Sequence, residues 1–127
     1  MVREEDKAII NHYVAAYNSL DVAGMVKFLH NDIIFRNVSN GEINTETRGI
    51  QEFIQLAEKS SKMFSSRCQT IMSVHAIEDK VEVQIDYEGT LAVDLPNGLS
   101  AGDKIQLKGK SIFGLVDGKI FMIEDYS

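Results

Sequence analysis

Residues 80–93 read KVEVQIDYEGTLAV, and apolar and polar side chains alternate through most of this stretch. A period of two predicts a β-strand with one face on a core and the other toward water. Gly89 interrupts the strand in its middle, where we expect a bulge that bends the sheet. The side chains expected on the core face are Val81, Val83, Ile85, Tyr87, Leu91 and Val93.

The alternation extends over the C-terminal half of the chain. Turn signals at Glu78-Asp79, Pro96-Asn97-Gly98 and Asp117-Gly118 divide this half into segments. An Asp-Gly pair between two alternating runs is typical of a tight hairpin. The sequence therefore predicts consecutive antiparallel strands over residues 67–77, 80–93, 104–116 and 119–126.

The N-terminal half follows a helical period instead. Apolar residues recur every three or four positions, which predicts helices over residues 4–20, 22–29 and 49–64. Two short strands, 33–38 and 42–47, are expected between the second and third helices. This order predicts a single α+β domain over residues 1–127. In it, three N-terminal helices pack on a curved, mostly antiparallel sheet and enclose a cavity.

Charge and cysteine content restrict the partners and the compartment. The 127 residues include 13 basic and 19 acidic side chains, and the formal net charge of −6 argues against nucleic acid or an anionic membrane as partner. No segment approaches the roughly 20 apolar residues that span a bilayer, and the first residues do not resemble a signal peptide. Because Cys68 is the single cysteine, no internal disulfide can form. We expect a cytoplasmic protein with Cys68 in its core.

The last predicted strand is apolar on both sides. Phe121 and Ile123 lie on one side, and Ile120 and Met122 on the other. One side can pack on the helices, so the other needs cover, and a second copy of the chain is the usual source. The pattern therefore predicts a homodimer.

The histidines give no sign of a metal site. His12, His30 and His75 share no ligand spacing with one another or with Cys68. We therefore expect no metal in this protein.

Four stretches carry a resemblance to a known family. They are YVAAYNSLD at residues 13–21, TRGI at 47–50, LPNG at 95–98, and FGLVDGKI at 113–120 running on to EDY at 124–126. In this order and spacing the chain resembles the nuclear transport factor 2-like superfamily, and more narrowly its SnoaL-like and ketosteroid-isomerase-like branch. The resemblance implies a cone-shaped, cystatin-like fold with a pocket for a small, mostly apolar molecule. It also implies a homodimer and no cofactor.

Ketosteroid isomerases combine a carboxylate base with a tyrosine and a protonated aspartic acid. Tyr13 matches the tyrosine, but Asn37 stands at the position of the base and Lys110 near that of the acid. An amide cannot take up a proton at neutral pH. The resemblance therefore does not imply an isomerase of the ketosteroid mechanism.

Epoxide hydrolases of the limonene type use the same cone differently. An asparagine, a tyrosine and an aspartate hold the attacking water, and an arginine supports a second aspartate. Asn37 and Asp125 match the asparagine and the first aspartate, and Phe35 replaces the tyrosine. The arginine and the second aspartate fall near Glu88 and Thr90, so this half of the machinery is missing.

Asp125 is the strongest candidate for a reactive carboxylate. It shares a strand face with Phe121 and Ile123, and an apolar surrounding would raise its pKa toward the range of a useful base. The competing interpretation is that Asp125 lies beyond the core in water. In the polyketide cyclases that this branch includes, the pocket holds an acidic residue, which Asp125 or Asp86 could supply.

Tyr13 and Asn37 also allow two interpretations each. The Tyr13 hydroxyl could point into the pocket, or it could bond to a strand backbone while the ring fills the core. The Asn37 amide could hold a ligand or a water, or it could tie down neighbouring backbone.

Taken together, the sequence predicts a pocket for a small apolar organic molecule, with Asp125, Asn37 and Tyr13 as catalytic residues. The expected chemistry is that of a cofactor-independent isomerase, cyclase, hydratase, dehydratase or hydrolase. The alternative is a non-catalytic module for small-ligand binding or dimerisation that lacks the catalytic set. The other residues expected to line the pocket are Tyr17, Phe35, Phe53, Tyr87 and Phe113.

Overall fold

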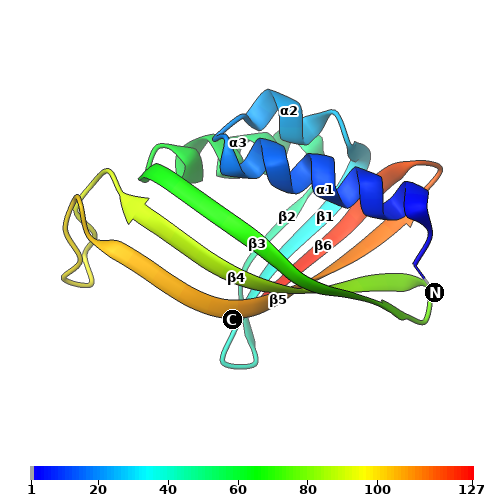
Figure 1. Ribbon diagram of the computed structural model, residues 1–127. Coiled ribbons are helices and arrows are strands. Elements are labelled where there is room, and N and C mark those ends of the chain that lie inside the picture. Colours follow the sequence, from blue (N-terminus) through cyan, green and yellow to red (C-terminus); the bar gives the residue numbers. More distant parts are fainter. Residues whose placement is uncertain (1) are drawn as a thin grey trace.

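A computed structural model describes residues 2–127 as one six-stranded sheet with helices across one of its faces (Figure 1). The helices are α1 (Glu4–Asn18), α2 (Val22–Val26) and α3 (Ile50–Ser61). The strands are β1 (Leu29–Ser39), β2 (Glu42–Arg48), β3 (Phe64–Ile77), β4 (Lys80–Leu91), β5 (Lys104–Val116) and β6 (Lys119–Tyr126).

The strand order brings the end of the chain into the middle of the sheet. The order is β2-β1-β6-β5-β4-β3. Strands β1 and β6 run parallel, and every other neighbouring pair is antiparallel. Because β6 lies between β1 and β5, side chains from distant parts of the sequence meet beside it.

Bulges curve the sheet around the helices. Extra residues interrupt the pairing at Ser65 and Met72 in β3 and at Phe121 in β6, and such insertions increase local bending and twist. Gly89, where we expected a bulge, pairs regularly with Ile105, so that prediction was wrong. Its hydrogen side chain makes room instead, because a Cβ there would lie 2.9 Å from the Phe64 ring.

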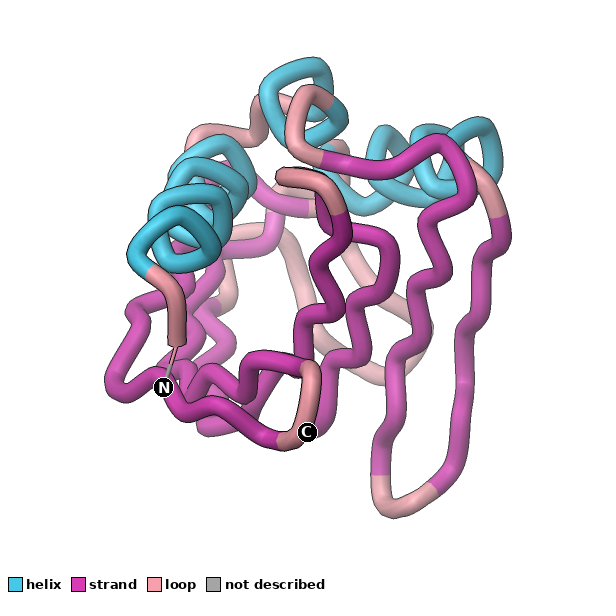
Figure 2. Tube along the Cα trace, turned by 90° about the vertical axis from the view of Figure 1, so that its right-hand side faces the viewer, coloured by secondary structure: helices cyan, strands magenta, loops and turns pink. Residues whose placement is uncertain are grey.

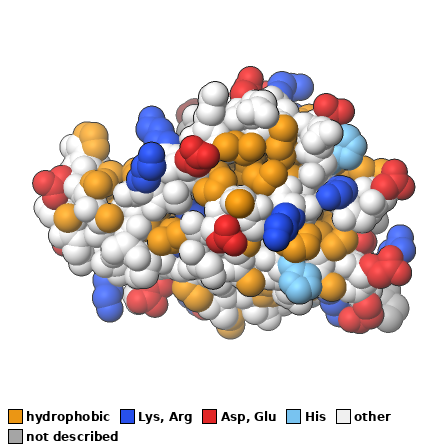
Figure 3. Space-filling view, turned by 90° about the horizontal axis from the view of Figure 1, so that it is seen from above, with side chains coloured by type: hydrophobic (Ala, Val, Ile, Leu, Met, Phe, Trp, Pro, Cys, Tyr) orange, Lys and Arg blue, Asp and Glu red, His pale blue; other side chains and the backbone are white. Residues whose placement is uncertain are grey.

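The core lies between the concave face of the sheet and the helices. Ile10 and Val14 of α1 and Phe53 of α3 are buried against Val83 and other apolar residues of the strands. Figure 2 shows the helices lying over the curved strands. From the helical side, apolar side chains gather in the middle of the surface, with charged side chains beside and around them (Figure 3).

The α+β class and the curved, mostly antiparallel sheet agree with the prediction, and the three N-terminal helices agree only in part. Helices α1 and α3 have 15 and 12 residues, whereas α2 has 5. Leu29, expected at the end of the second helix, already pairs with Ile120 of the sheet. Phe64, expected at the end of the third, begins β3 and pairs with Leu91.

Three further predictions about individual residues were wrong. Cys68 and Val93 are exposed rather than in the core. In β6 the bulge at Phe121 changes the alternation, so that Ile120 and Ile123 both join the core. The bulge could not be predicted, because an extra apolar residue leaves no clear mark on an apolar run.

The outer face near the end of β6 is polar as well as apolar. Arg36 Nε lies 2.6 Å from Glu46 Oε1, and Arg36 Nη1 lies 2.9 Å from Glu124 Oε2. These contacts link β2, β1 and β6 on the side away from the helices.

Candidate functional site

A cavity of about 400 Å³ lies between the helices and the concave face of the sheet. Its volume falls within the ~300–1,000 Å³ range of small-molecule sites. We expected Asp125, Asn37 and Tyr13 to share one pocket, and all three line this cavity. The five aromatic residues expected beside them also line it: Tyr17, Phe35, Phe53, Tyr87 and Phe113.

The sheet register sets the neighbours of Asp125. Across β1, Asp125 stands beside Asn37, and across β5 it stands beside Ser111. Neighbouring strands lie roughly 4.8 Å apart, so the side chains of paired residues on one face are close together. Asp125 is therefore flanked on both sides by polar side chains that reach the same cavity.

The Asp125 carboxylate is held by one hydrogen bond in an apolar surrounding. Ser111 Oγ donates to Asp125 Oδ1 over 2.5 Å, and Ser111 itself is buried. Burial raises the pKa of Asp125 from 3.8 to about 6, although the hydrogen bond from Ser111 acts to lower it. At neutral pH such a group is mostly ionised and is a stronger base than an ordinary aspartate.

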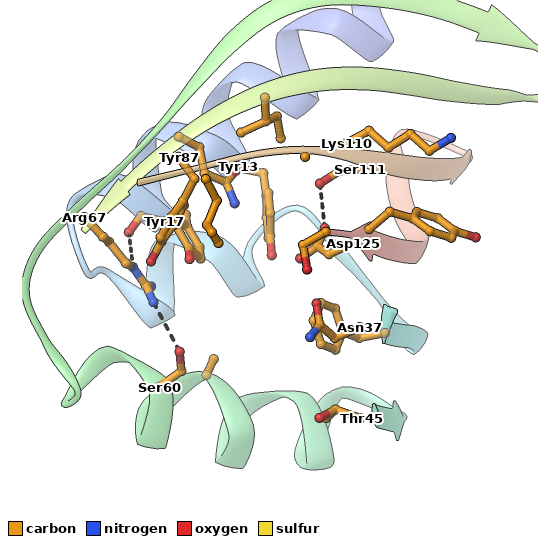
Figure 4. A pocket seen from close by; sticks show the side chains of 18 of the residues that line it. Tyr13, Tyr17, Asn37, Thr45, Ser60, Arg67, Tyr87, Lys110, Ser111 and Asp125 are labelled. Atoms are coloured by element: carbon orange, nitrogen blue, oxygen red, sulfur yellow. Dashed lines mark hydrogen bonds between the residues drawn. The ribbon is translucent and has the colours of Figure 1, made fainter. Parts of the chain in front are cut away.

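Tyr13 presents a free hydroxyl to the cavity. Its ring packs edge-on against Phe113, with centroids 6.0 Å apart. Within residues 2–127 its hydroxyl makes no hydrogen bond, either to the strand backbone or to another side chain. Its pKa is raised well above the ordinary value, first by burial and then by the charge of Asp125. In Figure 4 the hydroxyl of Tyr13 and the carboxylate of Asp125 point into the same space.

Asn37 is both a cavity residue and a link to the neighbouring strand. Its Nδ2 donates to Asn44 Oδ1 over 3.0 Å, which occupies one of its amide hydrogens. Thr45, its partner on β2, also lines the cavity. The side-chain oxygen of Asn37, Oδ1, accepts no hydrogen bond within residues 2–127, so it remains available to a ligand or a water.

Aromatic rings form much of the remaining wall. The rings of Phe35 and Phe53 pack edge to face with their centroids 6.0 Å apart. The rings of Tyr17 and Tyr87 pack in the same way with their centroids 6.4 Å apart. The pKa of Tyr17 is raised mainly by burial, with Tyr87 as a second cause. These rings give the cavity an apolar lining suited to a flat organic molecule.

Sequence reasoning missed Arg67, which is 4% exposed and lines the cavity. Its Nε donates to the Tyr17 carbonyl over 2.9 Å. The guanidinium carbon lies 3.6 Å from the centroid of the Tyr17 ring. The sequence places Arg67 on the same strand face as Gln69 and Ile71, which was the one indication that it points inward. A single charged residue in a strand, however, is usually exposed.

Ser111 was missed for a different reason. From the Asp117-Gly118 turn, a regular hairpin would place Lys110 opposite Asp125. The bulge at Phe121 shifts this register by one residue and brings in Ser111.

Three other charged candidates have their charged groups away from the centre of the site. Lys110 Nζ lies 3.7 Å from Glu82 Oε2 on the outer face. Asp86 lies 3.7 Å from Lys108 Nζ in a separate outer groove and does not line the cavity. Glu88 is exposed and pairs regularly with Gln106 of β5.

Residues 2–127 hold no group of three or more His, Cys, Asp and Glu side chains arranged for a metal ion. None of the helices in this range is both long enough and apolar enough to cross a membrane.

Known proteins share this sequence pattern and this fold. The SnoaL-like domain family matches residues 10–123. No curated protein matches the sequence. Among solved structures, AclR, a candidate hydroxylase from Streptomyces galilaeus, is 25% identical with a TM-score of 0.74, and the match covers 95% of this chain and 86% of AclR.

Two further structures share the fold at lower identity. A candidate polyketide cyclase from Xanthomonas campestris pv. campestris has a TM-score of 0.83 and 20% identity, over 98% of this chain and 91% of that one. An LEH-like epoxide hydrolase from M. tuberculosis has a TM-score of 0.75 and 17% identity, over 96% of this chain and 81% of that one.

Proposed function

Because the chain belongs to the SnoaL-like domain family, we propose that its cavity binds a small, mostly apolar organic molecule and that Asp125 removes a proton from it. The observation that carries this proposal is the surrounding of Asp125. Its carboxylate lies in an apolar cavity, has a pKa of about 6, and stands beside Asn37 and close to the free hydroxyl of Tyr13.

The proposed reaction begins with a proton transfer. Asp125 takes a proton from a carbon of the substrate, and the electron pair of that bond moves toward a neighbouring oxygen. The Tyr13 hydroxyl donates a hydrogen bond to this oxygen, which stabilises the developing negative charge. Return of the proton at another position gives an isomer, and loss of a hydroxide as water gives a dehydrated product.

Asn37 has a positioning role in this proposal. Its free carbonyl oxygen accepts a hydrogen bond from the substrate or from a water beside Asp125. With a water in that place, Asp125 would activate the water instead, and the reaction would be a hydration or hydrolysis. None of these steps calls on a cofactor or a metal.

A generic carbon acid tests the proposal without knowledge of the natural substrate. Removal of the ring C–H proton of 5-nitrobenzisoxazole breaks its N–O bond and releases a coloured nitrophenolate. We expect the wild-type protein to open this probe roughly 100-fold or more faster than Asp125→Asn. The rate should rise with pH and level off above an inflection near pH 6, as the carboxylate ionises.

Asp86→Asn is the matched control, because Asp86 lies in the outer groove rather than in the cavity. It should retain the wild-type rate. Equal rates for the wild-type protein and Asp125→Asn would contradict the role of Asp125 as a base.

A binding module without catalysis is the second candidate, and the contacts of Asn37 favour it. The Asn37 amide already bonds to Asn44, and Phe35 offers no hydroxyl beside it. This function is supported if the protein binds an aromatic probe in the cavity but opens 5-nitrobenzisoxazole no faster than Asp125→Asn.

We also propose that the protein is a cytoplasmic homodimer. A free cysteine at the exposed position 68 suits a reducing compartment. The outer face of the sheet carries half-buried apolar residues such as Ile34 and Ile112 among its charges, which suits contact with a second copy. Native mass spectrometry measures the subunit number directly, and a monomer at micromolar concentration would contradict this part of the proposal.

A further inference from the structure

Arg67 is a cation buried at the wall of the cavity, and only 4% of it is exposed. Within residues 2–127 no carboxylate lies within 4.0 Å of its guanidinium, although Arg3, Arg36 and Arg48 all have such a partner. Buried charges in proteins are usually paired, because removing them from water is unfavourable. A buried arginine with a purely structural role would be expected to have a carboxylate partner, and Arg67 lacks one within residues 2–127.

The hydrogen bonds of Arg67 are also incomplete. Its Nε donates to the Tyr17 carbonyl over 2.9 Å, and its Nη1 has only a long contact of 3.5 Å with Ser60 Oγ. Its Nη2 is buried and finds no hydrogen-bond partner among residues 2–127. The Tyr17 ring stacks on the guanidinium at 3.6 Å and provides partial compensation through a cation–π contact. The edge of the guanidinium that carries the two Nη atoms is thus left without a strong acceptor.

Because of its position, Arg67 can meet a ligand bound in the cavity. Arg67 lines the same cavity as Asp125. Figure 4 shows Arg67, Tyr17 and Tyr87 grouped at one end and Asp125 with Ser111 at the other, with Tyr13 between them. A negatively charged group of a ligand would be attracted to the first end and repelled from the second. A guanidinium edge also matches a carboxylate in shape, because both are planar and offer two parallel contacts.

We propose that Arg67 binds a carboxylate group of the ligand and thereby turns the other end of the ligand toward Asp125. This inference rests on the proposed use of the cavity as a ligand site. It narrows the substrate class to flat, mostly apolar acids whose reactive carbon lies away from the charged group.

The two probes 2-naphthoate and 2-naphthamide test this assignment, since they share one ring system and differ in charge. Calorimetric titration at pH 7.5 should show that the wild-type protein binds the carboxylate roughly tenfold or more tightly than the amide. In Arg67→Gln this preference should disappear, because glutamine can still donate to the Tyr17 carbonyl but carries no charge. Arg48→Gln, an exposed arginine on β2, is the matched control and should keep the wild-type preference.

Several outcomes would overturn the proposal. Equal affinity of the wild-type protein for both probes, or binding of neither, contradicts it. An equal loss of affinity for both probes in Arg67→Gln means that Arg67 only supports the fold. The pair of hydrogen bonds between Asn18 and Gln69 still joins α1 to β3 in this variant, which favours its folding.

A measurement on the wild-type protein keeps the test decisive if the variant does not fold. The Nε–H resonance of Arg67 in a ¹⁵N NMR spectrum should move on addition of 2-naphthoate and stay in place with 2-naphthamide. An unchanged resonance at saturating 2-naphthoate would overturn the assignment.

The outcome is separable from that of the proposed catalytic function. The 5-nitrobenzisoxazole probe is neutral and reports on Asp125, whereas the naphthoate pair reports on Arg67 and needs no turnover. If the protein prefers 2-naphthoate but does not open 5-nitrobenzisoxazole, Arg67 remains the anion site and Asp125 is not the base. If it opens 5-nitrobenzisoxazole but binds both naphthalene probes equally, Asp125 remains the base and Arg67 is not an anion site.

Discussion

Asp125 is a carboxylate whose placement in the cavity lowers the stability of the fold at neutral pH. Its pKa is about 6 in the folded chain, against an ordinary value of 3.8. Between these two values the folded state binds more protons than the unfolded state, so the free energy of unfolding falls as pH rises. Above pH 6 this contribution is constant. A pKa difference of about 2 corresponds to roughly 3 kcal/mol.

Asp125→Asn should therefore stabilise the protein at neutral pH while removing the proposed base. At pH 7.5 we expect its free energy of unfolding to exceed that of the wild-type protein by roughly 1–3 kcal/mol. Near pH 4 the two should be nearly equal, because the wild-type carboxyl is then protonated. Urea denaturation at both pH values measures the difference.

Asp32→Asn, at an exposed position, provides the control and should show no comparable gain. A wild-type protein that is at least as stable as Asp125→Asn at pH 7.5 would mean that Asp125 is well solvated.

At the residue scale, the sequence located Asp125, Asn37 and Tyr13 at one cavity but missed their supporting residues. The three were found because strand alternation and family resemblance point to them. Arg67 escaped because burial of a charge depends on tertiary contacts with α1, which no local pattern encodes. The roles proposed for these residues remain predictions.

At the scale of elements, the hairpin of β5 and β6 decides the composition of the site. The bulge at Phe121 sets Ser111 rather than Lys110 opposite Asp125. The turn at Asp117-Gly118 was readable from sequence, whereas the bulge was not, because an extra apolar residue in an apolar strand changes no local preference. The C-terminal end of α2 was also predicted wrongly. Leu29 has helical spacing in the sequence, but it pairs with β6 and so belongs to the sheet.

Gly109 tests how closely β5 must approach the end of β6. A Cβ at this position would lie 2.5 Å from the backbone carbonyl oxygen of Tyr126, which cannot move without the strand. We expect Gly109→Ala to lower the free energy of unfolding by roughly 1–3 kcal/mol. It should also slow the opening of 5-nitrobenzisoxazole, because Asp125 precedes Tyr126 directly. Chemical denaturation and the probe assay provide the two readouts.

Lys108→Ala on the same strand is the comparison, since its exposed side chain has only a weak contact with Asp86. Its stability should stay within about 0.5 kcal/mol of the wild-type value. If Gly109→Ala is as stable and active as Lys108→Ala, the close approach of β5 to the end of β6 is needed neither for stability nor for activity.

At the scale of the whole molecule, the change from helical to strand period along the chain predicted the architecture. The family resemblance drawn from the sequence motifs is confirmed by the match to the SnoaL-like domain over residues 10–123. The strand order with β6 between β1 and β5 did not follow from periodicity, because pairing between distant strands depends on the complete set of contacts.

A filled cavity should bind ligands poorly without loss of stability. Ala57 is buried on α3 and lines the cavity. We expect Ala57→Leu to raise the free energy of unfolding, by up to about 2 kcal/mol, because the added carbons enter empty space. The same variant should bind 2-naphthoate roughly tenfold or more weakly, as measured by calorimetry.

Ala15→Leu on the exposed side of α1 should alter neither property. A loss of roughly 1–3 kcal/mol in Ala57→Leu would be the signature of an overpacked core and would contradict the presence of free volume.

The most direct test of the account is the titration of the Asp125 carboxyl carbon by ¹³C NMR, with Asp125→Asn identifying the resonance. We expect a pKa near 6 in the wild-type protein, and a higher one in Ser111→Ala, where the hydrogen bond that stabilises the charged form is lost. A pKa close to the ordinary 3.8 in the wild-type protein would contradict the central claim that the cavity holds a carboxylate in an apolar surrounding.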